Sequence, residues 1–98
     1  MKLIDIVVPC YNEEEVLPLF VSETEKVLDL VEGYAFRYIF VDDGSRDGTL
    51  KILRTLAARS DRVKYLSFSR NFGKEAALYA GLSHSTGDYV AVMDADLQ

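Results

Sequence analysis

Phe36-Arg37-Tyr38-Ile39-Phe40-Val41 is a mostly apolar run that stops at Asp42-Asp43-Gly44-Ser45, and the same pattern recurs along the chain. An apolar run of this length, bounded by turn residues, predicts a buried strand over Phe36–Val41. Asp47 is the expected N-cap of a following helix, whose apolar face is formed by Leu50, Leu53, Leu56 and Ala57. A strand that leads directly into a helix is typical of a parallel sheet.

The strand-to-helix alternation extends in both directions from this segment. Three further strands are predicted at Leu3–Val8 (closed by Pro9), Val63–Phe68 and Tyr89–Met93. Two further helices are predicted, one from Glu13 to about Val31 with glutamates in its first turn and a stop at Gly33, the other over Glu75–Ser83. The predicted fold class is therefore α/β, a mostly parallel sheet with helices on both faces.

Composition narrows the class of protein. The 98 residues are 49% hydrophobic and 28% charged, which is ordinary globular chemistry for one small domain or part of a larger one. A net charge of −5 argues against a nucleic-acid partner, because phosphate-backbone binding needs a basic face. We find no signal peptide and no apolar run of about 20 residues, and Cys10 stands alone. We expect a cytoplasmic chain, or the cytoplasmic part of one that continues.

Polar and charged residues follow every predicted strand. They are Pro9-Cys10-Tyr11-Asn12-Glu13, Asp42-Asp43, Ser69-Arg70-Asn71-Phe72-Gly73-Lys74 and Asp94-Ala95-Asp96. In parallel sheets ligands bind beyond the carboxyl ends of the strands. Carboxylates at two ends and cations at a third predict a shared site there.

Asp94-Ala95-Asp96-Leu97-Gln98 holds two carboxylates one residue apart. In extended backbone, residues i and i+2 point the same way, so Asp94 and Asp96 are expected to converge, with the Gln98 carbonyl on the same side. Oxygen ligands of this kind suit Mg²⁺ or Mn²⁺, which usually arrives with substrate phosphates. The alternative is a solvated turn after a strand.

The segment Asp42–Thr49 allows several interpretations. A calcium-binding loop fails, because Arg54 stands where the bidentate glutamate belongs. A plain strand-to-helix turn explains most of the segment but not the adjacent carboxylates. We predict that Asp43, or Asp42, accepts hydrogen bonds from a ribose or a base.

The other two strand ends also have simpler explanations. Tyr11 either stacks on a base or packs in the fold, and at most one of the three glutamates from Glu13 reaches a ligand. Arg70 to Lys74, before a helix and with Gly73 allowing close approach, is a candidate diphosphate loop, although it lacks the full P-loop spacing. The chain also lacks the G-x-G-x-x-G pattern of dinucleotide sites.

Taken together, these motifs resemble the family 2 glycosyltransferases with a GT-A fold, closest to the dolichol-phosphate mannosyltransferase and bactoprenol glucosyltransferase type. The resemblance spans the whole chain in order, through Val7–Glu14, Val41–Ser45, Ser69–Lys74 and Asp94–Gln98. It implies a Rossmann-like, nucleotide-sugar-binding part over residues 1–98, with the acceptor-binding half outside this chain.

The resemblance also implies site residues and a reaction. Base and ribose would contact Pro9, Tyr11, Glu13, Val41 and Asp43; metal and diphosphate would contact Asp94, Ala95, Asp96 and Gln98, with Lys74 nearby. The implied enzyme is inverting and Mg²⁺- or Mn²⁺-dependent, and it moves a hexose from a UDP- or GDP-sugar to an acceptor, expected to be a polyprenyl phosphate at the cytoplasmic face of a membrane. No residue is assigned as the general base.

Two other functions are left open by the residues. The chain is either a transferase part or a catalytically silent nucleotide-sugar-binding module. A phosphotransfer domain with Asp94 as nucleophile fits less well, because its aspartate pair belongs after the first strand. A parallel sheet ending at a fourth strand exposes an edge, so we also expect self-association.

Overall fold

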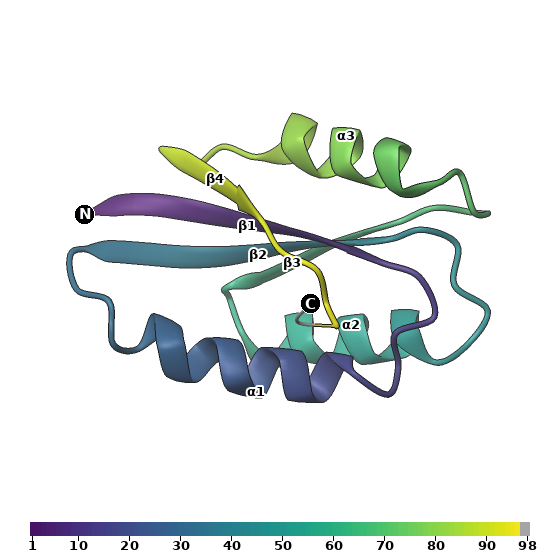
Figure 1. The fold of residues 1–98 in the computed structure, drawn as a ribbon, viewed down its shortest axis with the longest axis horizontal. Coiled ribbons are helices and arrows are strands. Elements are labelled where there is room, and N and C mark those ends of the chain that lie inside the picture. The colour runs from purple at the N-terminus through teal and green to yellow at the C-terminus, as the bar shows by residue number, and fades with distance from the viewer. Residues whose placement is uncertain (97–98) are drawn as a thin grey trace.

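The computed structural model describes residues 1–96, and within that range four strands form one parallel sheet in the order β3-β2-β1-β4. The strands are β1 (Lys2–Cys10), β2 (Tyr34–Asp42), β3 (Val63–Ser67) and β4 (Tyr89–Val92), and the helices are α1 (Leu17–Leu28), α2 (Thr49–Arg59) and α3 (Lys74–His84). Figure 1 shows α1 and α2 on one side of the sheet and α3 on the other. The predicted α/β class with helices on both faces is confirmed. None of the helices in residues 1–96 combines the length and the apolar character that crossing a membrane requires.

All strand pairings are parallel, which gives the sheet two chemically different rims. The β1–β2 register runs from Lys2 opposite Tyr34 to Cys10 opposite Asp42. We call the edge where the strands end the carboxyl rim, and the edge where they begin the amino rim. The loops that follow β1, β2, β3 and β4 therefore meet at the carboxyl rim.

β1 is longer than predicted, because Pro9 does not end it. Pro9 lies opposite Val41, and the pairing with β2 continues to Cys10. β4 pairs with β1 only as far as Val7, so the missing N–H of Pro9 interrupts no ladder bond on that side. The polar loop that follows β1 therefore begins after Cys10, two residues later than predicted.

α1 is shorter than predicted, and the expected acidic first turn is wrong. The N–H groups of Val16 and Leu17 both donate to the Glu13 carbonyl, at 3.1 and 3.0 Å, which makes residues 13–16 a turn before the helix. Pro18 then lies in the first helical turn, where its missing N–H removes no helical bond. The helix ends at Leu28, and Gly33 (φ 87°) lies in the connection to β2.

β2 begins two residues earlier than predicted, at Tyr34, and ends one residue later, at Asp42, and the remaining predicted ends differ by at most one residue. α2 begins at Thr49 with Gly48 as its N-cap, whereas Asp47 was predicted. Asp47 still binds the first turn, since its Oδ1 accepts from the Thr49 N–H at 2.9 Å. β3 ends at Ser67 and β4 at Val92, and α3 is one residue longer at each end.

The core lies on both faces of β1 and β2. On the α1 side, the Phe20 ring meets Tyr38 and Phe40 edge-on, with centroids 6.4 and 6.2 Å apart. Each such fully buried side chain contributes roughly 1.5–3 kcal/mol. On the opposite face α3 approaches closely at Gly81, where an added Cβ would lie 2.4 Å from Val7 Cγ1. Small residues thus set the distance between α3 and the sheet, as its alanine-rich sequence predicts.

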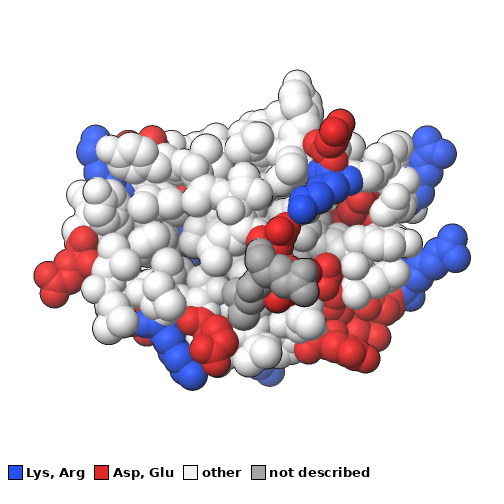
Figure 2. All heavy atoms as spheres, viewed as in Figure 1, with Lys and Arg blue, Asp and Glu red and all other residues white. Residues whose placement is uncertain are grey.

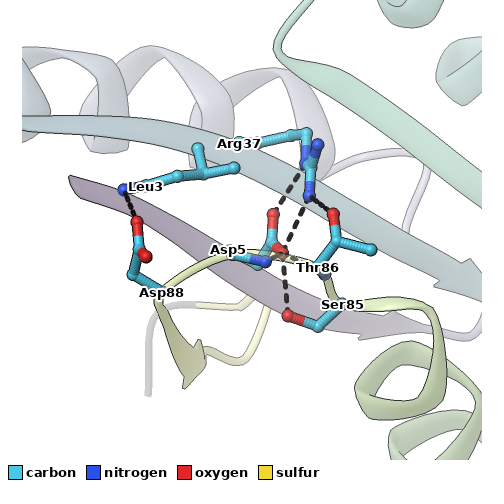
Figure 3. Close-up of polar contacts among 7 residues, drawn as sticks. Leu3, Asp5, Arg37, Ser85, Thr86 and Asp88 are labelled. Atoms are coloured by element: carbon cyan, nitrogen blue, oxygen red, sulfur yellow. Dashed lines mark hydrogen bonds and ion pairs between the residues drawn. The ribbon is translucent and has the colours of Figure 1, made fainter. Parts of the chain in front are cut away.

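A polar cluster closes the amino rim (Figure 3). The Asp5 carboxylate is fully buried and accepts from Arg37 Nε at 2.7 Å and Arg37 Nη2 at 2.9 Å. It also accepts from the Ser85 hydroxyl at 2.7 Å and from the N–H groups of Thr86 and Gly87 at 3.0 and 2.8 Å. Burial raises the pKa of Asp5, but these donors outweigh it and bring the pKa to about 2. This amino-rim clamp ties the connection before β4 to β1 and β2.

Candidate functional site

A cavity of about 350 Å³ opens at the carboxyl rim and joins residues that follow β1, β2 and β4 with the first residue of α3. β1 and its loop supply four residues, Asp43 follows β2, Lys74 begins α3, and Asp94 to Asp96 follow β4. The lining residues are Pro9, Cys10, Tyr11, Glu13, Asp43, Lys74, Asp94, Ala95 and Asp96.

The cavity brings together most of the site residues that were predicted from the sequence. Every predicted nucleotide-binding residue lines it except Val41, which is fully buried inside β2. Of the three predicted metal ligands, Asp94 and Asp96 line the cavity, whereas Gln98 lies outside the described residues. Their individual roles stay predictions; what the structure adds is their common location.

The loop after β1 is held in place by the loop after β2. The N–H of Asn12 donates to Ser45 Oγ at 2.8 Å, and Asn12 Oδ1 accepts from the Arg46 N–H at 2.8 Å. The N–H of Glu13 donates to Thr49 Oγ1 at 2.8 Å. Asn12 has φ 54°, a left-handed conformation that asparagine tolerates better than most residues. These bonds hold the turn that carries Tyr11, whose side chain remains 44% exposed at the cavity.

Asp43 organises the loop between β3 and α3. Its side chain is almost fully buried, and its carboxylate accepts from the N–H of Phe72 at 2.7 Å and of Gly73 at 3.0 Å. The Asn71 amide donates to the carboxylate and to the backbone carbonyl of Asp43, both at 3.1 Å. The residue predicted to bind a nucleoside therefore also fixes the backbone from which Lys74 extends.

Negative charge accumulates around the cavity. Figure 2 shows a dense group of acidic side chains toward the carboxyl rim, at the lower right of the view. Burial raises the pKa of Glu13, and the nearby charges of Asp96, Asp47 and Asp94 raise it further. Among the described residues that line the cavity, Lys74 is the one basic side chain, and its Nζ lies 3.0 Å from Asp94 Oδ1.

The residues at the cavity fit a divalent cation that brings its own phosphate ligands. Within residues 1–96, no group of three or more His, Cys, Asp or Glu side chains forms a ready-made metal cage. Mg²⁺ does not need one, because it is usually held by one or two carboxylates and substrate phosphates. Asp94 and Asp96 both line the cavity and supply two carboxylates, and the Lys74 ammonium already binds Asp94 as a cation.

Cys10 lines the cavity, as its place in the strand-end segment Pro9–Glu13 predicts, and burial raises the pKa of its thiol, with Glu13 and Asp42 adding to the effect. Two further features of the site escaped sequence reasoning. Asn12 and Asn71 form hydrogen bonds that hold the loops after β1 and β3 in place. The sequence signal for this role was an asparagine in a loop that follows a strand. Arg70, grouped with the candidate diphosphate loop, instead lies 4.6 Å from the Phe72 ring centroid and does not line the cavity.

A curated protein is similar to this chain in sequence. The prophage bactoprenol glucosyl transferase homolog of Escherichia coli (strain K12) is 46% identical over 95 residues, which is 97% of this chain and 31% of that protein. The chain therefore spans about a third of the length of this relative.

Solved structures share the fold. Staphylococcus aureus TarS, in complex with UDP-GlcNAc, superposes with a TM-score of 0.76 at 25% identity, over 98% of this chain and 27% of that one. The mannosyltransferase PcManGT from Pyrobaculum calidifontis, in complex with GDP-Man and Mn²⁺, gives a TM-score of 0.73 at 28% identity, over 95% and 27% of the two chains. The predicted Rossmann-like half of a GT-A fold is confirmed.

The profile of the family described as "Glycosyl transferase family 2" matches residues 5–98, from the start of the amino-rim clamp through the last carboxylates of the cavity. The chain belongs to glycosyl transferase family 2.

Proposed function

We propose that this chain is the donor-binding part of a metal-dependent, inverting glycosyltransferase that moves a hexose from a UDP- or GDP-sugar to a polyprenyl phosphate. The observation that carries the proposal is that residues following β1, β2 and β4, together with Lys74 at the start of α3, line one cavity at the carboxyl rim. In an open parallel sheet this is where a nucleotide is expected to bind.

The donor would lie across the carboxyl rim. Tyr11, Glu13 and Asp43 are proposed to contact the base and ribose, with Pro9 and Val41 as the backbone beneath them. Lys74 is the lining cation available to the diphosphate. UDP-GlcNAc in TarS and GDP-Man in PcManGT support a nucleoside-diphosphate sugar as the ligand class.

Asp94 and Asp96 are the proposed holders of Mg²⁺ or Mn²⁺, together with Gln98 from outside the described residues. When bound, the cation would neutralise the charge that develops on the leaving diphosphate. The two carboxylates would hold the cation in the cavity, where Glu13 lies within their electrostatic reach. The Mn²⁺ in the PcManGT complex supports a divalent metal in this fold.

The proposed acceptor explains why the site can lack a strong base. A lipid phosphate is already ionised, so its oxygen can attack the sugar carbon without first losing a proton, unlike an alcohol. Attack from the side opposite the diphosphate would invert the configuration at that carbon. The relative named as a bactoprenol glucosyl transferase homolog supports this acceptor class.

Calorimetric titration of the chain with UDP-glucose and GDP-mannose, with and without Mn²⁺, tests the donor and metal assignments. We expect binding that Mn²⁺ strengthens, and we expect Asp96→Asn to weaken the Mn²⁺-dependent part about ten-fold, because it removes a charged ligand. Asp61→Asn, which removes the same charge from an exposed residue ahead of β3, is the matched control.

The possible results separate the candidate functions. Binding of neither nucleotide would contradict the donor role, and equal Mn²⁺ dependence in Asp96→Asn would contradict the metal assignment. Tight binding, with no sugar transferred to polyprenyl phosphate by the full-length enzyme, would favour the silent binding module.

We further propose that the chain self-associates through β4. Its apolar side chains Tyr89, Val90 and Val92 are 54%, 46% and 50% exposed, and only β1 pairs with this strand within residues 1–96. An exposed apolar edge strand is a template for pairing with another chain.

A further inference from the structure

Lys74 occupies a carboxylate that the proposed cation also needs. Its Nζ lies 3.0 Å from Asp94 Oδ1, and the two side chains are 62% and 42% exposed. Both residues line the same cavity, together with Glu13 and Asp96. A protein cation therefore already binds a carboxylate that would also hold the proposed metal.

The backbone of Lys74 is held in place, but its ion pair with Asp94 is weak enough for the ammonium to leave Asp94 and bind another anion. Lys74 is the first residue of α3, and its backbone follows the loop that the buried Asp43 carboxylate holds at Phe72 and Gly73. Only the exposed side chain has to move. An exposed ion pair of this kind contributes about 0–1 kcal/mol, and a diphosphate offers the ammonium more negative charge than one carboxylate does.

We infer that Lys74 is an exchangeable counter-ion: it neutralises Asp94 in the empty site and turns to the donor diphosphate when the nucleotide arrives, which releases Asp94 for the cation. The inference rests on the proposed donor and metal function. Its consequence is that nucleotide and cation bind with positive coupling through this one side chain. Because coupling is reciprocal, each ligand must strengthen the other by the same factor.

The exchange predicts opposite effects of removing Lys74 on cation affinity and on nucleotide affinity, which a simple phosphate-binding role does not. Removing the ammonium leaves Asp94 uncompensated beside Asp96 and Glu13, so a cation alone should bind more tightly. The same change removes a positive charge from the diphosphate, so a nucleotide alone should bind more weakly. A lysine that only binds phosphate would produce the second effect without the first.

The test measures free Mn²⁺ by electron paramagnetic resonance during titration of the chain, with and without saturating UDP. We expect Lys74→Gln to tighten Mn²⁺ binding in the absence of UDP about three- to five-fold, the range open to an exposed ion pair. The factor by which UDP strengthens Mn²⁺ binding should fall by a similar amount. Lys74→Arg keeps the charge and should retain the coupling in part.

Lys64→Gln is the matched control, because it removes an exposed lysine charge from β3. It should leave both measurements at the wild-type values, and circular dichroism should show all variants folded. Unchanged Mn²⁺ affinity in Lys74→Gln, with UDP still bound by the wild type, overturns the exchange and leaves the proposed function standing. A wild-type chain that binds neither UDP nor GDP overturns the proposed function, and the exchange with it.

Discussion

Gly44 lies directly under the loop that carries Arg70 and Asn71. A Cβ built at Gly44 would stand 2.2 Å from the Arg70 carbonyl carbon and 2.4 Å from the Asn71 nitrogen, both backbone atoms. Its φ of +70° adds a second reason for glycine. The Asp43–Gly44 pair therefore attaches the β3–α3 loop twice, through the carboxylate and through close backbone contact.

Gly44→Ala should destabilise the chain and weaken nucleotide binding. Gly33→Ala is the matched control, because Gly33 has φ +87° but nothing within 4 Å of an added Cβ. Both variants share the backbone strain, and only Gly44→Ala adds overpacking of about 1–3 kcal/mol. Urea unfolding should show this difference, and UDP titration should show weaker binding for Gly44→Ala alone. Equal unfolding free energies for the two variants would contradict the contact.

At the scale of single residues, the location of the candidate site could be predicted from the sequence, but the hydrogen bonds within it could not. Carboxylates such as Asp43 and Asp94 could be predicted at strand ends, because an apolar run that stops at an acidic residue is visible in one dimension. The bonds from Phe72 and Gly73 to Asp43 could not, because they join residues 29 and 30 apart through backbone N–H groups that every residue has.

At the scale of elements, the order and type of every helix and strand in residues 1–96 could be predicted. The strands followed from apolar runs that end at turn residues, α1 and α2 from the helical spacing of apolar residues, and α3 from its alanine-rich sequence. The ends were harder. Pro9 usually stops a strand, but here β2 continues alongside it. The α1 start was misplaced because residues 13–16 form a turn. The N–H groups of Glu13 and Glu14 donate to Thr49 and Asp47, which only the tertiary fold brings near.

The amino-rim clamp predicts acid sensitivity. The pKa of Asp5 falls from 3.8 to about 2 on folding, so its stabilising contribution is complete above pH 4 and is lost as the pH falls toward 2. The shift corresponds to about 2 kcal/mol. Unfolding free energies measured by urea between pH 5 and pH 2 should fall by about this amount from this group.

The matched variant isolates Asp5 from the other carboxylates. Asp5→Asn should be less stable at pH 7, because it leaves the Arg37 charge in a mostly buried position without its partner. It should also lose about 2 kcal/mol of the pH dependence over that range. Asp61→Asn, at an exposed position, should keep the wild-type slope. An unchanged slope in Asp5→Asn would show that the clamp does not set the acid response.

At the scale of the whole molecule, the β4 edge predicts association that depends on concentration. Sedimentation velocity of the chain should show dimers or larger species, and Val90→Lys should shift the distribution toward monomer by placing a charge on the exposed strand. Val27→Lys is the matched control, since Val27 on α1 is 61% exposed and lies away from this edge. A monomer at all concentrations would contradict the proposed self-association.

The two rims of the sheet divide the molecule between separate tasks. Asp5, Arg37 and the loop before β4 hold the strands together at one rim, while the residues of the cavity gather at the other. Substitutions of exposed cavity residues such as Tyr11 can therefore change the proposed binding site while the amino-rim clamp still ties β1, β2 and the connection before β4 together. In a fold arranged in this way, the residues of the binding site can change during evolution while the contacts that hold the sheet together stay the same.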